Sequence, residues 1–111
     1  MKLIVGYLTA KPGQREAFLA ATRDHAEQSR LEPGCHYFEL LPLPDHPDRM
    51  LLAEAFASEA AHRKHEDTDH MRAVWAVMPQ MLVHASIDNV VSDFVTHDED
   101  WFDQAPGPSA G

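Results

Sequence analysis

The sequence predicts an α+β protein with the ferredoxin-like order β-α-β-β-α-β, in which helices cover one face of a four-stranded antiparallel sheet. Two observations predict this fold class. Short segments rich in Val, Ile, Leu and aromatic residues recur between turns that contain Pro and Gly, which is typical of strands. Segments with apolar residues at three- and four-residue spacing separate the first strand from the second and the third from the fourth, which is typical of helices.

The beginning of the chain predicts a strand followed by one helix. Residues 2–9 (KLIVGYLT) are β-branched and aromatic and precede a Lys-Pro-Gly turn. We expect Pro12 in the first helical turn, where its missing N–H costs nothing, and the helix extends to about Arg30. Pro33 and Gly34 then end it. The expected inner face of this helix consists of Phe18, Ala21, Thr22, His25 and Ser29.

Three further segments predict strands. Residues 35–42 (CHYFELLP) form the second strand, and residues 49–56 (RMLLAEAF) form the third. The proline-rich residues 41–48 connect these two strands. Residues 85–94 (ASIDNVVSDF) supply the fourth strand, which completes the sheet.

Two helices are expected between the third and fourth strands. Ser58 is the expected N-cap of a short helix that ends near His65, because a hydroxyl can accept a free backbone N–H. Asp67 and Thr68 both offer the N-cap of the next helix, which extends to about Leu82. Pro79 near the end of this helix predicts a kink or a break in the last turn.

Both faces of the predicted sheet are apolar, whereas the helices can cover only one of them. Alternation along the first and third strands places apolar residues on both sides, among them Leu3, Val5, Tyr7, Met50, Leu52 and Phe56. An apolar face without helices needs a partner. We therefore predict a homodimer whose subunits pack sheet to sheet.

Composition and charge restrict the possible functions. The chain has 111 residues, of which 44% are hydrophobic, as expected for one soluble globular domain. Its net charge of −9 argues against nucleic acid and against an anionic membrane surface as partners. No segment is apolar over the length of a membrane span, and Cys35 is the only cysteine, so an intramolecular disulfide is impossible. These features predict a cytoplasmic protein.

The composition changes near the end of the chain. Residues 1–94 form the predicted domain, whereas residues 95–111 are first acidic and then rich in Pro, Gly and Ser. The two aromatic residues of this tail, Trp101 and Phe102, are expected to dock on the partner subunit.

Three histidines within residues 54–75, His62, His65 and His70, mark the candidate site. Histidine exchanges protons near neutral pH because its ordinary pKa is roughly 6.5. His65 and His70 are the candidate catalytic residues, as general base and as hydrogen-bond partner of the substrate, whereas His62 is expected at the surface. The alternative is that both brace the junction between the two helices. No further ligand stands at a convincing spacing beside His62 and His65, so we expect no metal.

Five other residues are expected to line a substrate pocket, namely Trp75, Met71, His25, Phe38 and Glu54. Trp75 is suited to stack on a planar aromatic ring, although an indole also serves as a large core residue. His25 faces either the pocket or a hydrogen-bonded position in the core. Glu54 stands among apolar neighbours, where a carboxylate needs a partner or a raised pKa. It is therefore either a structural anchor or an acid–base group.

Four segments of the chain carry a resemblance to a known family. They are KPG at residues 11–13, EPGC at 32–35, AEAFAS at 53–58 and AAHRKHEDTDHM at 60–71. Together they resemble the antibiotic biosynthesis monooxygenase family over about residues 1–94. The resemblance implies a dimeric α+β barrel with a pocket between the sheet and the helices of each subunit. It also implies oxidation of a quinol-like aromatic by molecular oxygen without a cofactor, because a deprotonated hydroquinone can pass an electron to oxygen itself.

The sequence departs from the haem-degrading relatives of this family. These relatives place an Asn on the first strand, a Trp near the helix break and an iron-binding His ten residues later. The corresponding residues here are Gly6, His65 and Trp75. An indole thus stands where the iron ligand would be, and we expect no haem.

Two alternative functions remain open from the sequence. One is a non-oxidative isomerase of a small phosphorylated, sugar-like compound, which requires cationic side chains such as Lys64, Arg63 or Arg72 in the pocket. The other is a binding or interaction module whose pocket is collapsed. The size of the cavity separates this second alternative from both enzymes.

Overall fold

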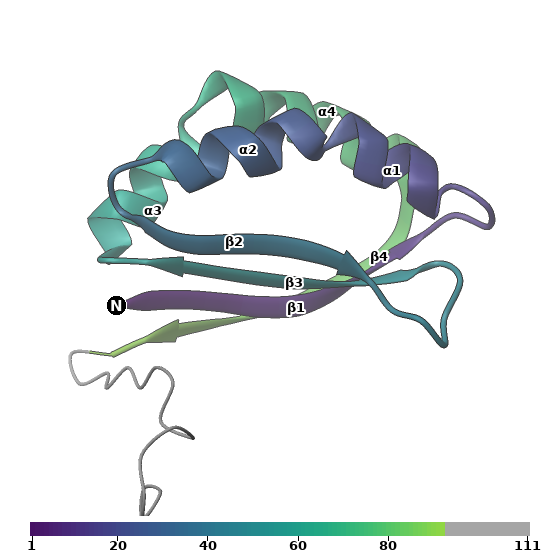
Figure 1. Ribbon diagram of the computed structural model, residues 1–111, viewed down its shortest axis with the longest axis horizontal. Helices are drawn as coiled ribbons and strands as arrows, with labels where there is room; N and C mark the ends of the chain where they lie inside the picture. The colour runs from purple at the N-terminus through teal and green to yellow at the C-terminus, as the bar shows by residue number, and fades with distance from the viewer. Residues whose placement is uncertain (93–111) are drawn as a thin grey trace, which may run out of the picture.

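A computed structural model describes residues 1–92, which form a four-stranded sheet with helices on one of its faces (Figure 1). In chain order the elements are β1 (Lys2–Ala10), α1 (Arg15–Ala21), α2 (Arg23–Leu31), β2 (Cys35–Pro42), β3 (Arg49–Phe56), α3 (Glu59–Glu66), α4 (Asp69–Met81) and β4 (Leu82–Val91). The predicted tail of residues 95–111, including the expected docking of Trp101 and Phe102, lies outside the described residues.

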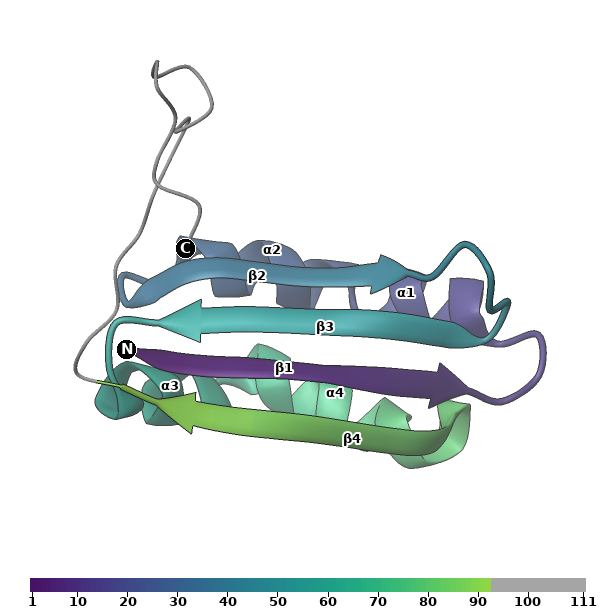
Figure 2. The ribbon, with the colours of Figure 1, turned by 90° about the horizontal axis from the view of Figure 1, so that it is seen from below.

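The sheet has the strand order β2-β3-β1-β4, and all neighbouring strands are antiparallel. The helices lie over the same face, so the described residues leave the other face uncovered, as the view from below shows (Figure 2). This arrangement confirms the predicted ferredoxin-like α+β fold.

Alternation along the strands separates a buried face from an outer face. Ile4 and Leu8 on β1, and Met50 and Phe56 on β3, are at most 4% exposed because they pack beneath the helices. Burying one large apolar side chain stabilises the fold by about 1.5–3 kcal/mol, so this face holds the core. On the outer face Tyr7 is 42% exposed.

The predicted first helix is divided into α1 and α2 at Thr22. The Thr22 hydroxyl donates to the backbone oxygen of Phe18 over 2.9 Å, and the backbone at Thr22 leaves helical geometry with φ −102° and ψ 3°. A threonine that bonds back to the preceding turn commonly bends a helix. Phe18, Thr22, His25 and Ser29 are buried as predicted, whereas Ala21 is exposed and the prediction for it was wrong.

Two further boundaries differ from the prediction. Pro12 lies in the turn before α1 and not in its first helical turn, because Gly13 follows with φ 76°, which is a left-handed conformation. β4 begins at Leu82, directly after α4, and not at residue 85. Pro79 stands in the last turn of α4 as expected. Among the described residues, no helix has the length and hydropathy to cross a membrane.

Two hydroxyl caps fix the junction between α3 and α4. The Ser58 oxygen accepts the backbone N–H of Ala61 over 3.1 Å, and the Thr68 oxygen accepts that of Met71 over 3.2 Å, so both predicted caps are confirmed. The Thr68 hydroxyl also donates to the backbone oxygen of His65 over 2.8 Å. Such caps contribute about 1 kcal/mol each and define where the two helices start. His65 is thereby held near the end of α3.

The turn after α2 packs closely against α3. A Cβ atom added at Gly34 would lie 2.4 Å from the Cβ of Ala61, so only glycine fits at this contact. Glu32 is the C-cap residue of α2 and stands directly before this turn. The close packing therefore brings the Glu32 carboxylate to the end of α3 that carries His65.

Candidate active site

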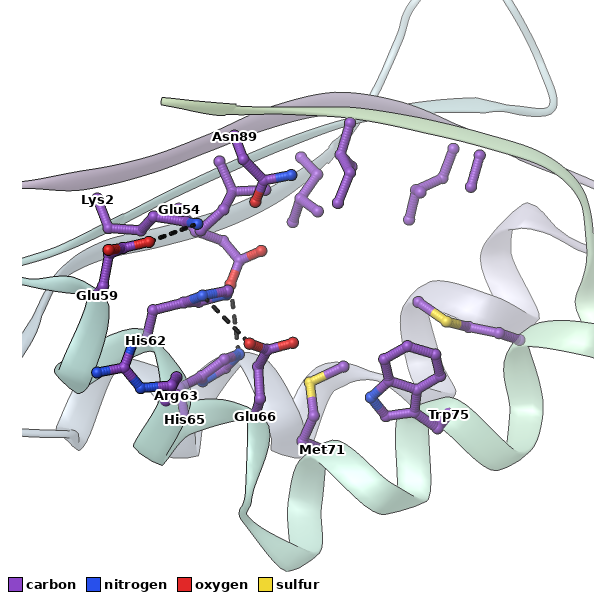
Figure 3. A pocket seen from close by; sticks show the side chains of 16 residues that line it. Lys2, Glu54, Glu59, His62, Arg63, His65, Glu66, Met71, Trp75 and Asn89 are labelled. Carbon is purple, nitrogen blue, oxygen red and sulfur yellow. Dashed lines mark ion pairs between the residues drawn. The ribbon is translucent and has the colours of Figure 1, made fainter. Parts of the chain in front are cut away.

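A cavity of about 620 Å³ lies between the sheet, on its β1 and β4 side, and the helices α3 and α4 (Figure 3). This volume is within the range of small-molecule sites, which is about 300–1,000 Å³. The space is not filled by side chains, which argues against the alternative of a collapsed pocket.

The two ends of the cavity differ in chemistry. One end is polar, with the ion pairs Lys2–Glu59 and His62–Glu66 at 3.9 and 3.3 Å. The other end is apolar and is lined by Ile4, Leu8, Leu52, Met71, Trp75, Met78, Ala85 and Ile87. Trp75 is 57% exposed, so it forms part of the cavity wall and is not a core residue. Its ring offers a flat surface on which a planar aromatic can stack.

His65 lies between two carboxylates where the polar end of the cavity meets the core. Its Nδ1 atom is 3.0 Å from Oε2 of Glu32, and its Nε2 atom is 3.3 Å from Oε1 of Glu54. The side chain of His65 is only 2% exposed. Three elements thus meet here, since His65 belongs to α3, Glu54 to β3 and Glu32 to the end of α2.

The surroundings of His65 favour its protonated form. Burial lowers the pKa of His65, but the contacts with Glu54 and Glu32, and the charges of these two carboxylates, outweigh burial and raise the pKa above its ordinary value. The Glu32–His65–Glu54 triad is therefore a largely buried histidine with a raised pKa that lies between two carboxylates.

The Glu54 carboxylate lies beside His65 on the wall of the cavity. One oxygen, Oε1, faces His65, but the geometry leaves this buried atom without a hydrogen bond from any described residue. The other oxygen points toward the cavity (Figure 3). A carboxylate oxygen accepts hydrogen bonds, so the oxygen that faces the cavity can accept one from a hydroxyl of a bound ligand.

Two more histidines, His70 and His25, extend the contacts of the triad into the protein. Oε2 of Glu32 is also 3.1 Å from Nε2 of His70, and Nδ1 of His70 is 2.7 Å from Nδ1 of His25. Burial, together with the charges of His65 and His70, lowers the pKa of His25 to about 3. His25 is therefore neutral near pH 7. Its ring also packs edge-on against Phe38, with a centroid distance of 5.1 Å.

The residues predicted for the site occupy two different places. His65, Glu54, Met71 and Trp75 line the large cavity. His25 and Phe38 line a second cavity of about 50 Å³, which also borders His65 and Glu54. His70 borders neither cavity and contacts Glu32 and His25 instead.

Two residues, His62 and Arg72, lie elsewhere than the interpretations of the sequence require. His62 was expected at the surface, but it is half-buried and lines the cavity. Burial lowers the pKa of His62 more than the nearby carboxylates raise it. Arg72 pairs with Asp67 and Asp69 and does not border the cavity. Among the described residues, no group of three or more His, Cys, Asp or Glu side chains is arranged to hold a metal ion.

The residue missed by sequence reasoning is Glu32. It is 33 positions from His65 in the chain and looks like the polar end of a surface helix. The available signal was its place directly before Pro33-Gly34, because a tight turn at the end of α2 fixes the direction of this side chain.

Comparisons with known proteins agree with this fold. The model of the family "Antibiotic biosynthesis monooxygenase" matches residues 1–76. The chain is 27% identical to the "Putative monooxygenase YcnE" of Bacillus subtilis (strain 168) over 82 residues, which cover 74% of this chain and 86% of that protein. It is also similar to the solved structure of a "Putative antibiotic biosynthesis monooxygenase" from Nitrosomonas europaea, with TM-score 0.78 and 27% identity over 85% of this chain and all of the other.

A solved protein structure from Shewanella oneidensis is similar as well, with TM-score 0.75 and 28% identity over 80% of this chain and 87% of that one. The family model and the similar structures lead to the same family. The chain belongs to the antibiotic biosynthesis monooxygenase family.

Proposed function

We propose that this protein is a cofactor-independent monooxygenase that oxidises a quinol-like aromatic with molecular oxygen. The observation that carries the proposal is the position of the Glu54–His65 pair on the wall of a cavity whose other end is apolar and includes Trp75. Such a cavity suits an uncharged ring that carries a hydroxyl group at one end.

In the proposed reaction the Glu54 carboxylate accepts a proton from the hydroxyl of the bound hydroquinone. The protonated His65 ring, with its Nε2 atom 3.3 Å from Oε1 of Glu54, holds the carboxylate in place. The deprotonated ring then passes electrons to oxygen. One oxygen atom enters the ring and the other leaves as water, and the hydroquinone supplies the electrons. The apolar end orients the ring against Trp75 and Met71 and excludes water.

The charge of the polar end argues against the isomerase alternative. Arg63 lines the cavity as the isomerase alternative requires, but Glu54, Glu59 and Glu66 line it as well and repel a phosphate group. Lys2 is already paired with Glu59 over 3.9 Å. These contacts support an uncharged substrate with a hydroxyl donor over a phosphorylated one.

Oxygen uptake with reduced naphthoquinones tests the proposed reaction. We expect uptake well above the rate of autoxidation without protein, and the same rate in the presence of a chelator, because no metal takes part. Uptake no faster than autoxidation for a series of hydroquinones would contradict the proposal. Loss of turnover with the chelator would contradict its independence of metal.

We further infer that the protein is a cytoplasmic homodimer whose subunits pack sheet to sheet. The uncovered face of the sheet supports this proposal, since large apolar side chains are exposed there, including Tyr7, Tyr37 and Leu41 at 42%, 43% and 48%. Sedimentation velocity at low micromolar concentration is expected to give the mass of two chains. A stable monomer at that concentration would contradict the inference.

A further inference from the structure

We propose that Glu32 is the positioning residue of this site, in which one carboxylate oxygen fixes the rings of His65 and His70 and sets the charge of His65. Its consequence for turnover rests on the proposed function. The geometric part does not, because it concerns contacts within the protein alone.

The geometry of Glu32 Oε2 carries the inference. This one atom lies 3.0 Å from Nδ1 of His65 and 3.1 Å from Nε2 of His70. A carboxylate oxygen only accepts, so each ring presents an N–H to it. With the Nδ1 proton of His65 held by Glu32, the nitrogen that can exchange a proton is Nε2, which faces Glu54. Glu32 thus determines that Nε2 of His65, and not Nδ1, is the nitrogen that exchanges a proton on the cavity side.

His25 completes this arrangement on the other side of His70. The two Nδ1 atoms of His25 and His70 are 2.7 Å apart, so one of them donates and the other accepts. The neutral ring of His25 can take either role by changing its tautomer. His70 therefore keeps its contact with Glu32 whether it is neutral or charged, and Glu32 remains in place in both states.

The backbone also holds Glu32 in a fixed position. Its N–H donates to the backbone oxygen of Ser29 over 3.1 Å, and the following turn packs Gly34 against Ala61. The Glu32 side chain is 18% exposed, so most of it is shielded from solvent. Its charge therefore acts on His65 with little screening.

Groups from every neighbouring element act on His65. They are Glu54 from β3, Glu32 from the end of α2, His25 from α2, His70 from α4 and His62 from α3 itself. The carboxylates favour the charged form of His65, whereas a charged His62 or His70 opposes it. Cys35 contributes no charge near neutral pH, since burial and the charges of Glu32 and Glu54 raise the pKa of its thiol.

The test is a histidine titration by NMR in wild-type protein and in Glu32→Gln. The amide has nearly the same shape as the carboxylate but no charge, so we expect the pKa of His65 to fall by about one unit or more. Glu27→Gln is the matched control, because it removes the same charge from an exposed position on α2 and should leave the titration of His65 unchanged. An unchanged pKa of His65 in Glu32→Gln would overturn the inference.

Kinetics supply the second measurement. In Glu32→Gln we expect kcat to fall about tenfold or more with little change in KM, because Glu32 does not border the cavity. The loss of activity with rising pH should begin at lower pH than in wild type, because His65 loses its proton earlier. Glu32→Asp keeps the charge, so its kcat and its pH profile should lie between those of Glu32→Gln and wild type. Wild-type kcat and an unshifted pH profile in Glu32→Gln would contradict the role in turnover.

Two outcomes separate this inference from the proposed function. If no hydroquinone is oxidised by the wild-type protein, the proposed function fails, but the NMR titration still decides whether Glu32 sets the state of His65. If Glu32→Gln does not fold by circular dichroism, Glu32→Asp carries the test. Its shorter side chain cannot reach both rings at once, so a kcat and a His65 titration identical to wild type would overturn the inference.

Discussion

Glu54→Gln is expected to lower kcat for hydroquinone oxidation by a factor of about 100 or more. The amide cannot accept a proton, although it fills the same space and still contacts His65. Because KM reports mainly on the apolar contacts with Trp75 and Met71, we expect it to change much less than kcat. Steady-state oxygen uptake over a range of hydroquinone concentrations measures both constants.

The control for this variant is Glu59→Gln. Glu59 also lines the cavity and carries the same charge, but its partner is Lys2 and not His65. We expect kcat to fall by less than about tenfold, because Glu59→Gln changes the charge of the cavity but removes no base. If Glu54→Gln retains more than half of the wild-type kcat, Glu54 is not the base and the proposed proton transfer is wrong.

Gly6→Asn is expected to destabilise the protein more than any other substitution discussed here, by about 3 kcal/mol or more. A Cβ atom at residue 6 would lie 2.1 Å from the backbone oxygen of Ser86 and 2.8 Å from Cα of Ile87. Both are backbone atoms of β4, so the strand itself must move. Gly6 is paired with Ile87 in the β1–β4 ladder, and that pairing would be disturbed along with the cavity wall.

Urea denaturation of Gly6→Asn beside Gly13→Asn measures this effect. Gly13 has open space around its Cβ position and a φ of 76°, which asparagine tolerates better than most residues. Gly13→Asn should therefore remain close to wild type in stability. A Gly6→Asn protein with an unchanged unfolding midpoint would show that β4 can shift without cost. It would also show that no steric conflict excludes an Asn at this position, where the haem-degrading relatives are expected to have one.

Most of the fold could be predicted because turn-forming residues mark the element boundaries. β2 and β3 have the predicted bounds of 35–42 and 49–56, since Pro-Gly and a proline-rich connection flank them. The division of the first helix at Thr22 could not be predicted, because a threonine within a helical pattern is common. Whether its hydroxyl bonds back to the preceding turn depends on the local packing.

The candidate site was predictable only in part. His65, Glu54 and Trp75 lie where the pattern of strand and helices indicated, on the cavity wall. The role of Glu32 and the direction of the His70 side chain could not be predicted, because both depend on how the turn after α2 closes against α3. A contact between residues 33 positions apart is a property of tertiary packing, and local periodicity carries no information about it.

The Glu32–His65–Glu54 triad is not required by selection for stability alone. Removing three ionisable groups from water costs several kcal/mol per charge, and their mutual attraction often fails to offset that cost. Well-packed apolar side chains at these three positions would give a more stable but inert molecule. A directed-evolution campaign that selects only for survival at high temperature would therefore tend to erase the triad, and with it the reactivity of the cavity.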